Sequence, residues 1–285
     1  MTPLDPLRDG IWLKREDEHQ LGAFKWRGAL ATLEARRPDV VVTASTGNHG
    51  AATAWAARRV GARAIVFVPH GATRTKVALV EAQGAELRVE GADMDEAKAA
   101  ARAHAAETGA FFFEDGAEPA QFDGYERIGH ELLGEVPRPA AVVVPVGNGA
   151  LAVGVFRALA ERAPAAERIA VAAAEAPAMY ESWRAGRPVD SDHCRTFADG
   201  LAVRVAIPLA VQELNALAQR FELVGEAELE AAVRAYAEHG IRVEGAAAAP
   251  LALASREELP RPLVLIVTGR NVDEAVYHRI LTGGP

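Results

Sequence analysis

The sequence predicts an α/β fold in which parallel strands are covered by helices on both faces. Short runs of β-branched residues alternate with alanine-rich stretches along almost the whole chain, as they do in βαβ units. The runs are apolar throughout, which is typical of strands buried on both faces. Of the 285 residues, 50% are hydrophobic and 25% are charged, which excludes a disordered, collagen-like or disulfide-stapled chain.

The expected strands are short clusters of Val, Ile, Leu, Phe and Ala, beginning with VVVT and ending with LVLIVT. They lie at 40–43, 64–68, 86–89, 111–113, 141–146, 169–173 and 263–268. The stretches between them are rich in Ala, Leu, Glu and Arg, which favour helix. The expected helices lie near 27–36, 49–60, 74–83, 93–107, 124–134, 150–163, 208–219 and 226–239. Residues 186–207 carry scattered Gly and Pro, so we expect a long connection there.

The charge and cysteine content narrow the class of protein. The net charge is −8 and no stretch concentrates basic residues, which argues against nucleic acid and anionic membranes as partners. The single Cys194 cannot form an internal disulfide, and the first ten residues lack the apolar region of a signal peptide. The most apolar window, 139–160, is interrupted by Pro and Gly, so it predicts a strand, a turn and a helix instead of a membrane span. A cytoplasmic protein is therefore expected.

Three strands run directly into a glycine-bearing turn and a helix, where parallel sheets bind their ligands. In the first turn, within residues 41–52, hydroxyl, amide and imidazole side chains meet backbone N–H groups at a helix start. This arrangement suits a carboxylate or phosphate. The residues of this loop are Ser45, Thr46, Gly47, Asn48 and His49. An ordinary helix N-cap is the alternative interpretation.

The second turn, in VVVPVGNGALAVG, carries Gly147 and Gly149, whose backbone can approach an anion at the helix N-terminus. The same residues match G-x-G-x-x-G/A with Ala152 in the last place, so a dinucleotide site remains an alternative. In the third turn, Thr268 ends a strand before Gly269, and its hydroxyl either faces a ligand or is an ordinary strand-end group.

Lys25 decides between these possibilities. The chain has only four lysines, namely Lys14, Lys25, Lys76 and Lys98. Lys25 lies between Phe24 and Trp26 and precedes Arg27, and desolvation together with a neighbouring cation is expected to lower its pKa. Such an amine is a nucleophile that can form a Schiff base. The alternative for Lys25, and our expectation for the other three lysines, is a surface lysine whose stem lies along apolar surface.

The motifs AFKWRGAL, ASTGNHGAA, PVGNGAL, the Asp199-Gly200 pair, VEGAAAA and VTGRNVD occur in this order. Together they resemble the fold-type II pyridoxal-phosphate enzymes, above all the serine/threonine dehydratase branch that includes serine racemase. The resemblance extends from residue 2 to residue 273. It implies a two-domain α/β fold like that of tryptophan synthase β, with pyridoxal 5′-phosphate as cofactor and a homodimer. The larger domain would comprise 1–39 and 118–285, and a small domain, 40–117, would carry the substrate-carboxylate loop.

The resemblance also implies roles for individual residues. Lys25 would hold the cofactor as a Schiff base and later carry the Cα proton, with Phe24 beside the cofactor. Asn48 would bind the cofactor's 3′-oxygen, Thr268 would face its pyridine nitrogen, and the loop 45–49 would bind the substrate carboxylate. The phosphate would be bound by backbone N–H groups of Gly147, Asn148, Gly149, Ala150 and Leu151. Asn148 and Ala150 depart from the usual four-glycine loop, which leaves the N–H geometry open.

The expected reaction is ammonia-lyase (dehydratase) chemistry, converting L-threonine or L-serine to a 2-oxo acid and ammonia through an aminoacrylate. Serine racemisation and β-replacement of the threonine-synthase type remain alternatives, because residues 121–132 resemble threonine synthases as much as dehydratases. A nicotinamide-dependent oxidoreductase or an amino-acid sensor is a remoter alternative, since neither gives Lys25 a role.

Two further expectations follow from the resemblance. Racemising relatives place a serine hydroxyl at the position of Thr46, opposite the lysine, and many dehydratases place alanine there. The β-branched Thr46 would crowd that face, so slow or absent racemisation is expected. Glu175, the carbonyl of Met179, and Glu181 match the spacing at which related enzymes bind Mg²⁺ or Ca²⁺, and hard cations prefer such oxygens.

Overall fold

The computed structural model describes residues 1–8 and 10–283, and for residues 75 and 76, which include Lys76, it describes the backbone alone. The chain divides into a larger unit, Met1–Phe24 with Tyr125–Pro285, and a smaller unit, Lys25–Gly124. Helix α1 (Trp26–Arg36) belongs to the smaller unit because it packs on α2 (Asn48–Val60). The predicted division into a larger domain, 1–39 with 118–285, and a small domain, 40–117, stays a prediction.

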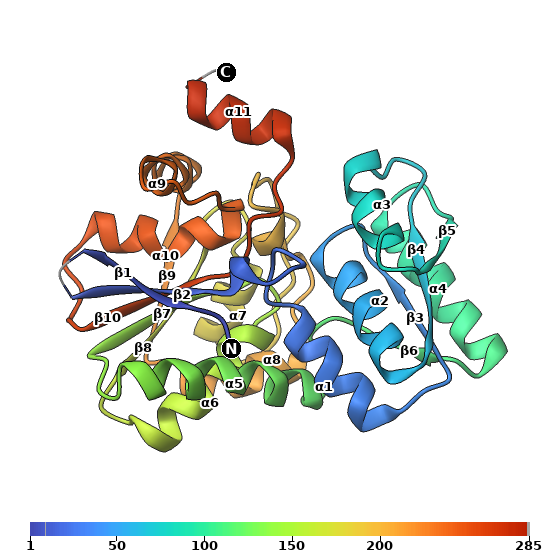
Figure 1. Ribbon diagram of the computed structural model, residues 1–285, viewed down its shortest axis with the longest axis horizontal. Coiled ribbons are helices and arrows are strands. Elements are labelled where there is room, and N and C mark those ends of the chain that lie inside the picture. Colours follow the sequence, from blue (N-terminus) through green and yellow to red (C-terminus); the bar gives the residue numbers. More distant parts are fainter. Residues whose placement is uncertain (9, 284–285) are drawn as a thin grey trace. The chain divides into compact units, whose positions relative to one another are not determined.

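The larger unit contains a six-stranded sheet in the order β1-β2-β10-β7-β8-β9, in which only β1 runs antiparallel to its neighbour (Figure 1). Its strands are β1 (Leu4–Arg8), β2 (Ile11–Arg15), β7 (Ala141–Pro145), β8 (Glu167–Ala173), β9 (Arg220–Val224) and β10 (Leu263–Val267). Its helices are η1 (Glu16–Glu18), α5 (Pro119–Glu135), which begins in the smaller unit, α6 (Ala150–Arg162), α7 (Ala178–Ala185), η2 (Asp199–Leu201), α8 (Pro208–Leu217), α9 (Glu226–Glu238), α10 (Gly245–Arg256) and α11 (Glu274–Thr282).

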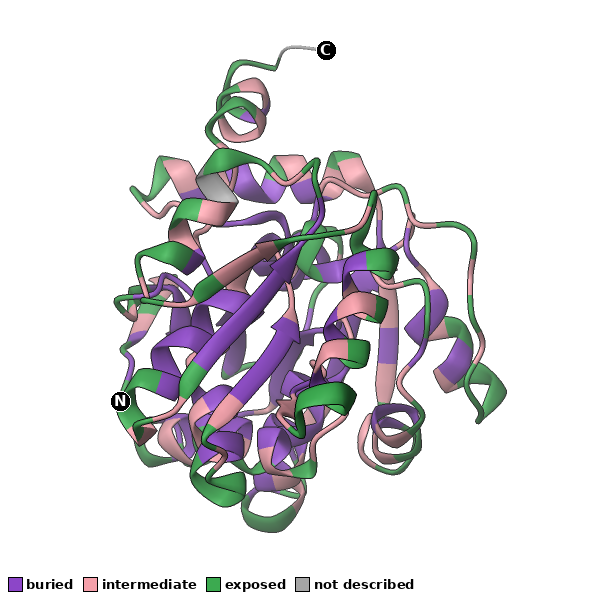
Figure 2. Cartoon of the chain, turned by 90° about the vertical axis from the view of Figure 1, so that its right-hand side faces the viewer, coloured by how far each residue is buried: buried purple, intermediate pink, exposed green. Residues whose placement is uncertain are grey.

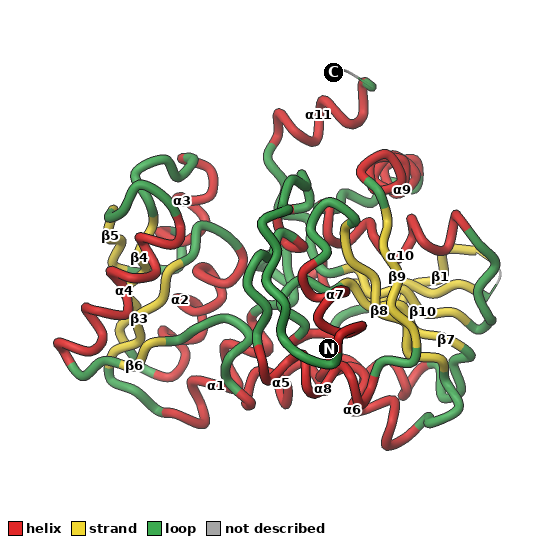
Figure 3. Tube along the Cα trace, turned by 180° about the vertical axis from the view of Figure 1, so that it is seen from behind, coloured by secondary structure: helices red, strands yellow, loops and turns green. Residues whose placement is uncertain are grey.

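Helices cover both faces of this sheet, which explains its uninterrupted apolar strands (Figure 3). The alanine-rich α10 packs across β7, β8, β9 and β10, and α9 packs on α10. Ile11, Val143, Val171 and Leu265 are buried in the core beneath them. Small alanine side chains allow the helix to approach the sheet closely, which keeps the core dense.

The smaller unit contains a fully parallel four-stranded sheet in the order β5-β4-β3-β6. Its strands are β3 (Val40–Ala44), β4 (Arg63–Val68), β5 (Glu86–Val89) and β6 (Phe111–Phe112), and its other helices are α3 (Arg74–Glu81) and α4 (Met94–Thr108). Val42, Ile65 and Phe67 pack against α4, whereas Val66 and Val68 on the opposite face pack with α2 and α3. In Figure 2 the strand arrows are largely buried and the exposed positions lie mainly on helices and loops.

The α/β class is confirmed, and every predicted strand and helix has a counterpart. The sequence analysis missed β1, β2, β9, α7, α10 and α11. Lys14 was wrongly expected at the surface: its side chain is 0% exposed, and Nζ donates to Glu131 Oε2 at 2.7 Å and to the carbonyl of Thr2 at 2.6 Å. Pairing with a carboxylate is what allows a lysine to be buried in a strand. Among the described residues, no helix is long and apolar enough to cross a membrane.

Candidate active site

The turn between β7 and α6 in the larger unit requires glycine at two positions. Gly149 has φ +93°, a left-handed conformation, and a Cβ there would lie 3.0 Å from Leu214 Cδ1. A Cβ at Gly147 would lie 2.2 Å from the carbonyl oxygen of Gly200, so the Asp199-Gly200 pair packs directly against this turn. Packing within the larger unit therefore requires glycine at both positions.

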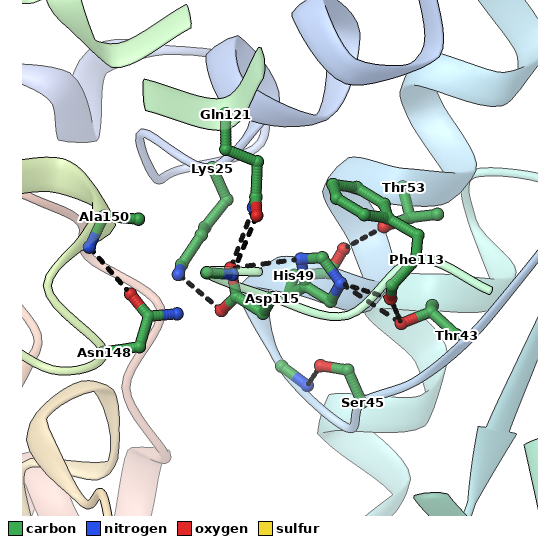
Figure 4. Close-up of polar contacts among 12 residues, drawn as sticks. Lys25, Thr43, Ser45, His49, Thr53, Phe113, Asp115, Gln121, Asn148 and Ala150 are labelled. Carbon is green, nitrogen blue, oxygen red and sulfur yellow. Dashed lines mark hydrogen bonds and ion pairs between the residues drawn. The ribbon is translucent and has the colours of Figure 1, made fainter. Parts of the chain in front are cut away.

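This turn has the donors that a phosphate needs. Within the described part of the chain, the backbone N–H groups of Gly147, Gly149 and Leu151 have no acceptor. They lie at the N-terminus of the 13-residue α6, where the helix dipole favours an anion. The N–H of Ala150 donates to Asn148 Oδ1 at 3.1 Å, so the departure from four glycines occupies one of the predicted donors (Figure 4). The residues present fit a phosphate group.

Thr268, just after β10, is buried and hydrogen-bonded to a carboxylate that the sequence analysis had not assigned. Its Oγ1 donates to Glu244 Oε1 at 3.0 Å, and Glu244 is the buried N-cap residue of α10. The N–H of Phe24 donates to the carbonyl of Thr268 at 3.0 Å. Because the hydroxyl proton points to Glu244, the lone pairs of Oγ1 remain available to a donor. Phe24 and Thr268, predicted to contact one cofactor, thus lie together.

In the smaller unit, Lys25 lies at the N-cap of α1, and its amine contacts a carboxylate. Nζ lies 2.6 Å from Asp115 Oδ2, as Figure 4 shows. The Lys25 side chain is 15% exposed. The neighbouring Trp26 ring packs edge-on against Trp55, and the Arg27 guanidinium lies 4.7 Å from the Trp26 ring centre. The aromatic and cationic neighbours expected from the sequence are therefore accompanied by an anionic partner that it did not indicate.

Asp115 follows β6 and is the main residue that the sequence analysis missed. Its Oδ1 accepts from Gln121 Nε2 at 3.0 Å and lies 3.5 Å from His49 Nδ1. Burial opposes ionisation of this carboxyl, but the charge of Lys25 and hydrogen bonds from Lys25 and Gln121 hold its pKa well below the usual range. Asp115 is therefore a carboxylate at neutral pH. The only sequence signal was an acid shortly after a predicted strand, among 39 Asp and Glu residues.

His49 is a buried, neutral imidazole whose tautomer is assigned by its neighbours. Burial lowers the pKa of His49, and the attraction of Asp115 only partly offsets this. Its Nε2 lies 3.1 Å from Thr43 Oγ1 and 3.4 Å from the carbonyl of Phe113. Thr43 Oγ1 uses its own proton on that carbonyl, at 2.8 Å, so both neighbours of Nε2 are acceptors. The proton of neutral His49 is thus on Nε2, and Nδ1 presents a lone pair toward Asp115.

The predicted carboxylate-binding loop connects β3 to the 13-residue α2. Four of its members, Ser45, Thr46, Gly47 and Asn48, are partly exposed, and His49 is buried. Gly47 N–H donates to Ser45 Oγ at 3.1 Å, and a Cβ at Gly50 would lie 2.8 Å from the Ser45 carbonyl oxygen. The loop is thus a tight turn at a helix N-terminus, the kind of site that binds anions.

The residues predicted to bind a metal lie around the first turn of α7 in the larger unit. Glu175 Oε2 lies 2.6 Å from His193 Nε2, Met179 is buried, and Glu181 is exposed. The metal site stays a prediction. The sequence analysis did not foresee that His193 would pair with Glu175.

Comparison with known proteins identifies the family. The model of the family "Pyridoxal-phosphate dependent enzyme" matches residues 1–269. The chain belongs to this pyridoxal-phosphate-dependent enzyme family. It is 35% identical over 271 residues to an L-threonine ammonia-lyase of Geobacter sulfurreducens. The matched region covers 92% of this chain and 67% of that relative.

Two solved structures of the family have the same fold. Processed threonine deaminase isoform 2 of Solanum lycopersicum matches with a TM-score of 0.93 and 27% identity, covering 99% of this chain and 87% of that one. Maize serine racemase matches with a TM-score of 0.89 and 25% identity, covering 99% and 92%. The predicted family, fold type and pyridoxal-phosphate cofactor are confirmed.

Proposed function

We propose that this enzyme is an ammonia-lyase that converts L-threonine or L-serine to a 2-oxo acid and ammonia. The observation that carries the proposal is the lysine amine at the N-cap of α1, partly exposed beside Asp115, in a chain of the pyridoxal-phosphate family. The relatives named L-threonine ammonia-lyase, from Geobacter sulfurreducens and Thermotoga maritima, support this reaction.

Backbone and side-chain groups of the chain would bind the cofactor. Gly147, Gly149 and Leu151 offer acceptor-free N–H groups to the phosphate. The Thr268 hydroxyl, which donates to Glu244 Oε1 here, would donate instead to the pyridine nitrogen. Asn48 would bind the 3′-oxygen and Lys25 would bind the cofactor covalently. When bound, the cofactor withdraws the negative charge that develops at Cα of the substrate.

The residues of the chain would bind the amino acid and move its proton. The N-terminus of α2 and the loop 45–49 would bind the substrate carboxylate, because backbone donors and the helix dipole favour an anion there. The amine of Lys25 would accept the Cα proton. His49, neutral and buried against Phe113, would help to order the loop from the inside.

Racemisation is the second activity that the site could support. A proton must then return to the face of Cα opposite Lys25, and Thr46 is the hydroxyl predicted to lie there. A threonine hydroxyl is a weak acid and base, and its methyl group restricts χ1. Dehydration is therefore proposed as the main reaction. A homodimer stays a prediction from the family resemblance, which light scattering tests, and a cytoplasmic location stays a prediction from the sequence.

An absorbance spectrum and an oxo-acid assay test the proposal together. The purified enzyme is expected to absorb near ~410 nm, in a band that borohydride bleaches, because a lysine bound to the cofactor absorbs there. Incubation with L-threonine or L-serine is expected to yield 2-oxobutanoate or pyruvate with equimolar ammonia. A colourless protein that takes up no added cofactor, or a coloured one that forms no oxo acid from either amino acid, would contradict the proposal.

A further inference from the structure

The Lys25 ammonium occupies a binding site for a primary ammonium group. Asp115 Oδ2 accepts from Nζ at 2.6 Å. Gln121 holds the other oxygen of this carboxylate at 3.0 Å, and Gln121 is itself fixed by accepting the N–H of Gly116 at 2.7 Å. The position of the carboxylate is therefore set by a buried amide as well as by the lysine.

A second acceptor lies beside this carboxylate. His49 directs its Nε2 proton at Thr43 and Phe113, which leaves the Nδ1 lone pair 3.5 Å from Asp115 Oδ1. A lone pair and a carboxylate repel each other unless a proton donor lies close to both. The pair formed by Asp115 and His49 Nδ1, which we name the acceptor pair, is thus built for a donor, preferably a cation (Figure 4).

Lys25 cannot remain that cation during catalysis. A lysine acts as a nucleophile or as a base only when its amine has lost the ammonium proton. The Asp115 carboxylate, whose side chain is 28% exposed, would then lose its positive partner and the attraction between them. Another primary ammonium, brought by the substrate, can restore the lost interaction.

We propose that the acceptor pair binds a β-ammonium group of the substrate, so that the enzyme acts on 2,3-diamino acids such as L-2,3-diaminopropionate in preference to β-hydroxy amino acids. This inference rests on the proposed function, because it keeps the lysine and the elimination and changes only the leaving group. An ammonium adds the attraction of opposite charges to its hydrogen bond with this carboxylate, whereas a hydroxyl offers the hydrogen bond alone.

The chemistry of the leaving group favours the same substrate. Lys25 takes the Cα proton, the electron pair of that bond forms the Cα–Cβ double bond, and the Cβ–N bond breaks with its electron pair on nitrogen. A β-ammonium leaves as neutral ammonia without any acid, whereas a β-hydroxyl must first receive a proton that Asp115, already ionised, does not carry. Water then completes the reaction: one 2,3-diaminopropionate and one water give one pyruvate and two ammonium ions.

Substrate preference of the cofactor-loaded enzyme is the first test. We expect kcat/KM for L-2,3-diaminopropionate to exceed that for L-serine by about tenfold or more. Asp115→Asn is expected to lower the ratio of these two kcat/KM values about 100-fold, because the substrate ammonium loses its charged partner. The change should lie mainly in KM. Glu114→Gln is the matched control, because this neighbouring acid pairs with Lys98 and Arg102 on α4, and its ratio should stay within about twofold.

Binding without turnover is the second test. In cofactor-loaded Lys25→Ala, equilibrium dialysis is expected to show L-2,3-diaminopropionate bound about tenfold or more tightly than L-alanine, which lacks the β-ammonium. Adding Asp115→Asn should remove this difference.

The outcomes separate the inference from the proposed function. The inference is overturned if Lys25→Ala binds L-2,3-diaminopropionate and L-alanine with equal affinity, or if the wild type has the higher kcat/KM for L-serine. Formation of oxo acid from L-serine in either case leaves the proposed function standing. An Asp115→Asn ratio equal to that of the wild type also overturns it. If Asp115→Asn does not fold, the wild-type ratio and the Lys25→Ala dialysis decide. Absence of the ~410 nm band, or absence of oxo acid from both L-threonine and L-serine, contradicts the proposed function itself.

Discussion

Lys14 in the larger unit and Lys25 in the smaller one have the same immediate partner. Each ammonium contacts a carboxylate, Glu131 at 2.7 Å and Asp115 at 2.6 Å. The Lys14 side chain is 0% exposed and is further held by the carbonyl of Thr2, whereas the Lys25 side chain is 15% exposed. Lys14 lies in a strand, and Lys25 begins a helix beside a strand-end loop.

The comparison shows that an ion pair alone does not distinguish Lys25, which we propose to be reactive, from the buried Lys14. The distinction lies in the surroundings, namely access for a reagent and further groups that can use the charge. Around Lys14 the carboxylate and carbonyl satisfy the ammonium in the core. Around Lys25 the partner carboxylate also faces the His49 lone pair, so the same charge pair can be exchanged for a ligand.

Removal of Lys25 should have the largest effect. Lys25→Ala is expected to reduce oxo-acid formation from L-threonine and L-serine by at least about 1,000-fold, because both the covalent attachment and the Cα base are lost. A coupled dehydrogenase assay measures the rate, and far-UV circular dichroism establishes that the variant is folded. A folded Lys25→Ala enzyme with a wild-type rate would show that Lys25 is not catalytic.

Removal of Lys14 should act on stability instead. Lys14→Met is expected to lower the free energy of unfolding by about 3 kcal/mol, because it leaves the largely buried Glu131 carboxylate without its cation. Urea denaturation measures the change. The control is Lys98→Met, whose more exposed pair with Glu114 should contribute less than about 1 kcal/mol. Equal losses in the two variants would show that burial of the Lys14 pair is unimportant.

Thr46 tests the face of the substrate opposite Lys25. Thr46→Ala is expected to keep oxo-acid formation within about tenfold of the wild type, a barrier change of roughly 1.4 kcal/mol, because elimination needs no group on that face. Chiral chromatography of the serine reaction, run beside the pyruvate assay, should find D-serine formed more slowly than pyruvate. Faster formation of D-serine would instead make the enzyme a racemase.

His49 is the titratable group that distinguishes the surroundings of Lys25 from those of Lys14. Because burial lowers its pKa below the ordinary 6.5, the unfolded chain binds a proton more readily, and His49 contributes stability that is lost as the pH falls through 6.5. His49→Gln, which keeps a donor near Thr43, should flatten the pH dependence of the unfolding free energy below 6.5. Denaturant titrations from pH 5 to 8 measure both slopes, and parallel curves would exclude a buried neutral His49.

Much of the fold could be predicted because the information is local. The strands β3, β4 and β7 are uninterrupted apolar runs, and the glycine turn after β7 has a steric cause at Gly147 and Gly149. The missed elements carry contradictory local signals. Strand β2 contains Lys14 and Arg15, and α10 contains Pro250, so each becomes regular only when its partners from elsewhere in the chain are present.

The sequence by itself determined the α/β class, the glycine turns, the family motifs and Lys25 as the candidate nucleophile, because each depends on residues close together in the chain. Only the tertiary structure revealed Asp115 and Glu244 as partners of Lys25 and Thr268, at separations of 90 and 24 residues. The residues next to an acid in the sequence do not indicate which distant group its carboxylate will contact. Its charge state and role follow from burial and from the groups that folding brings to it, and these are properties of the packed chain.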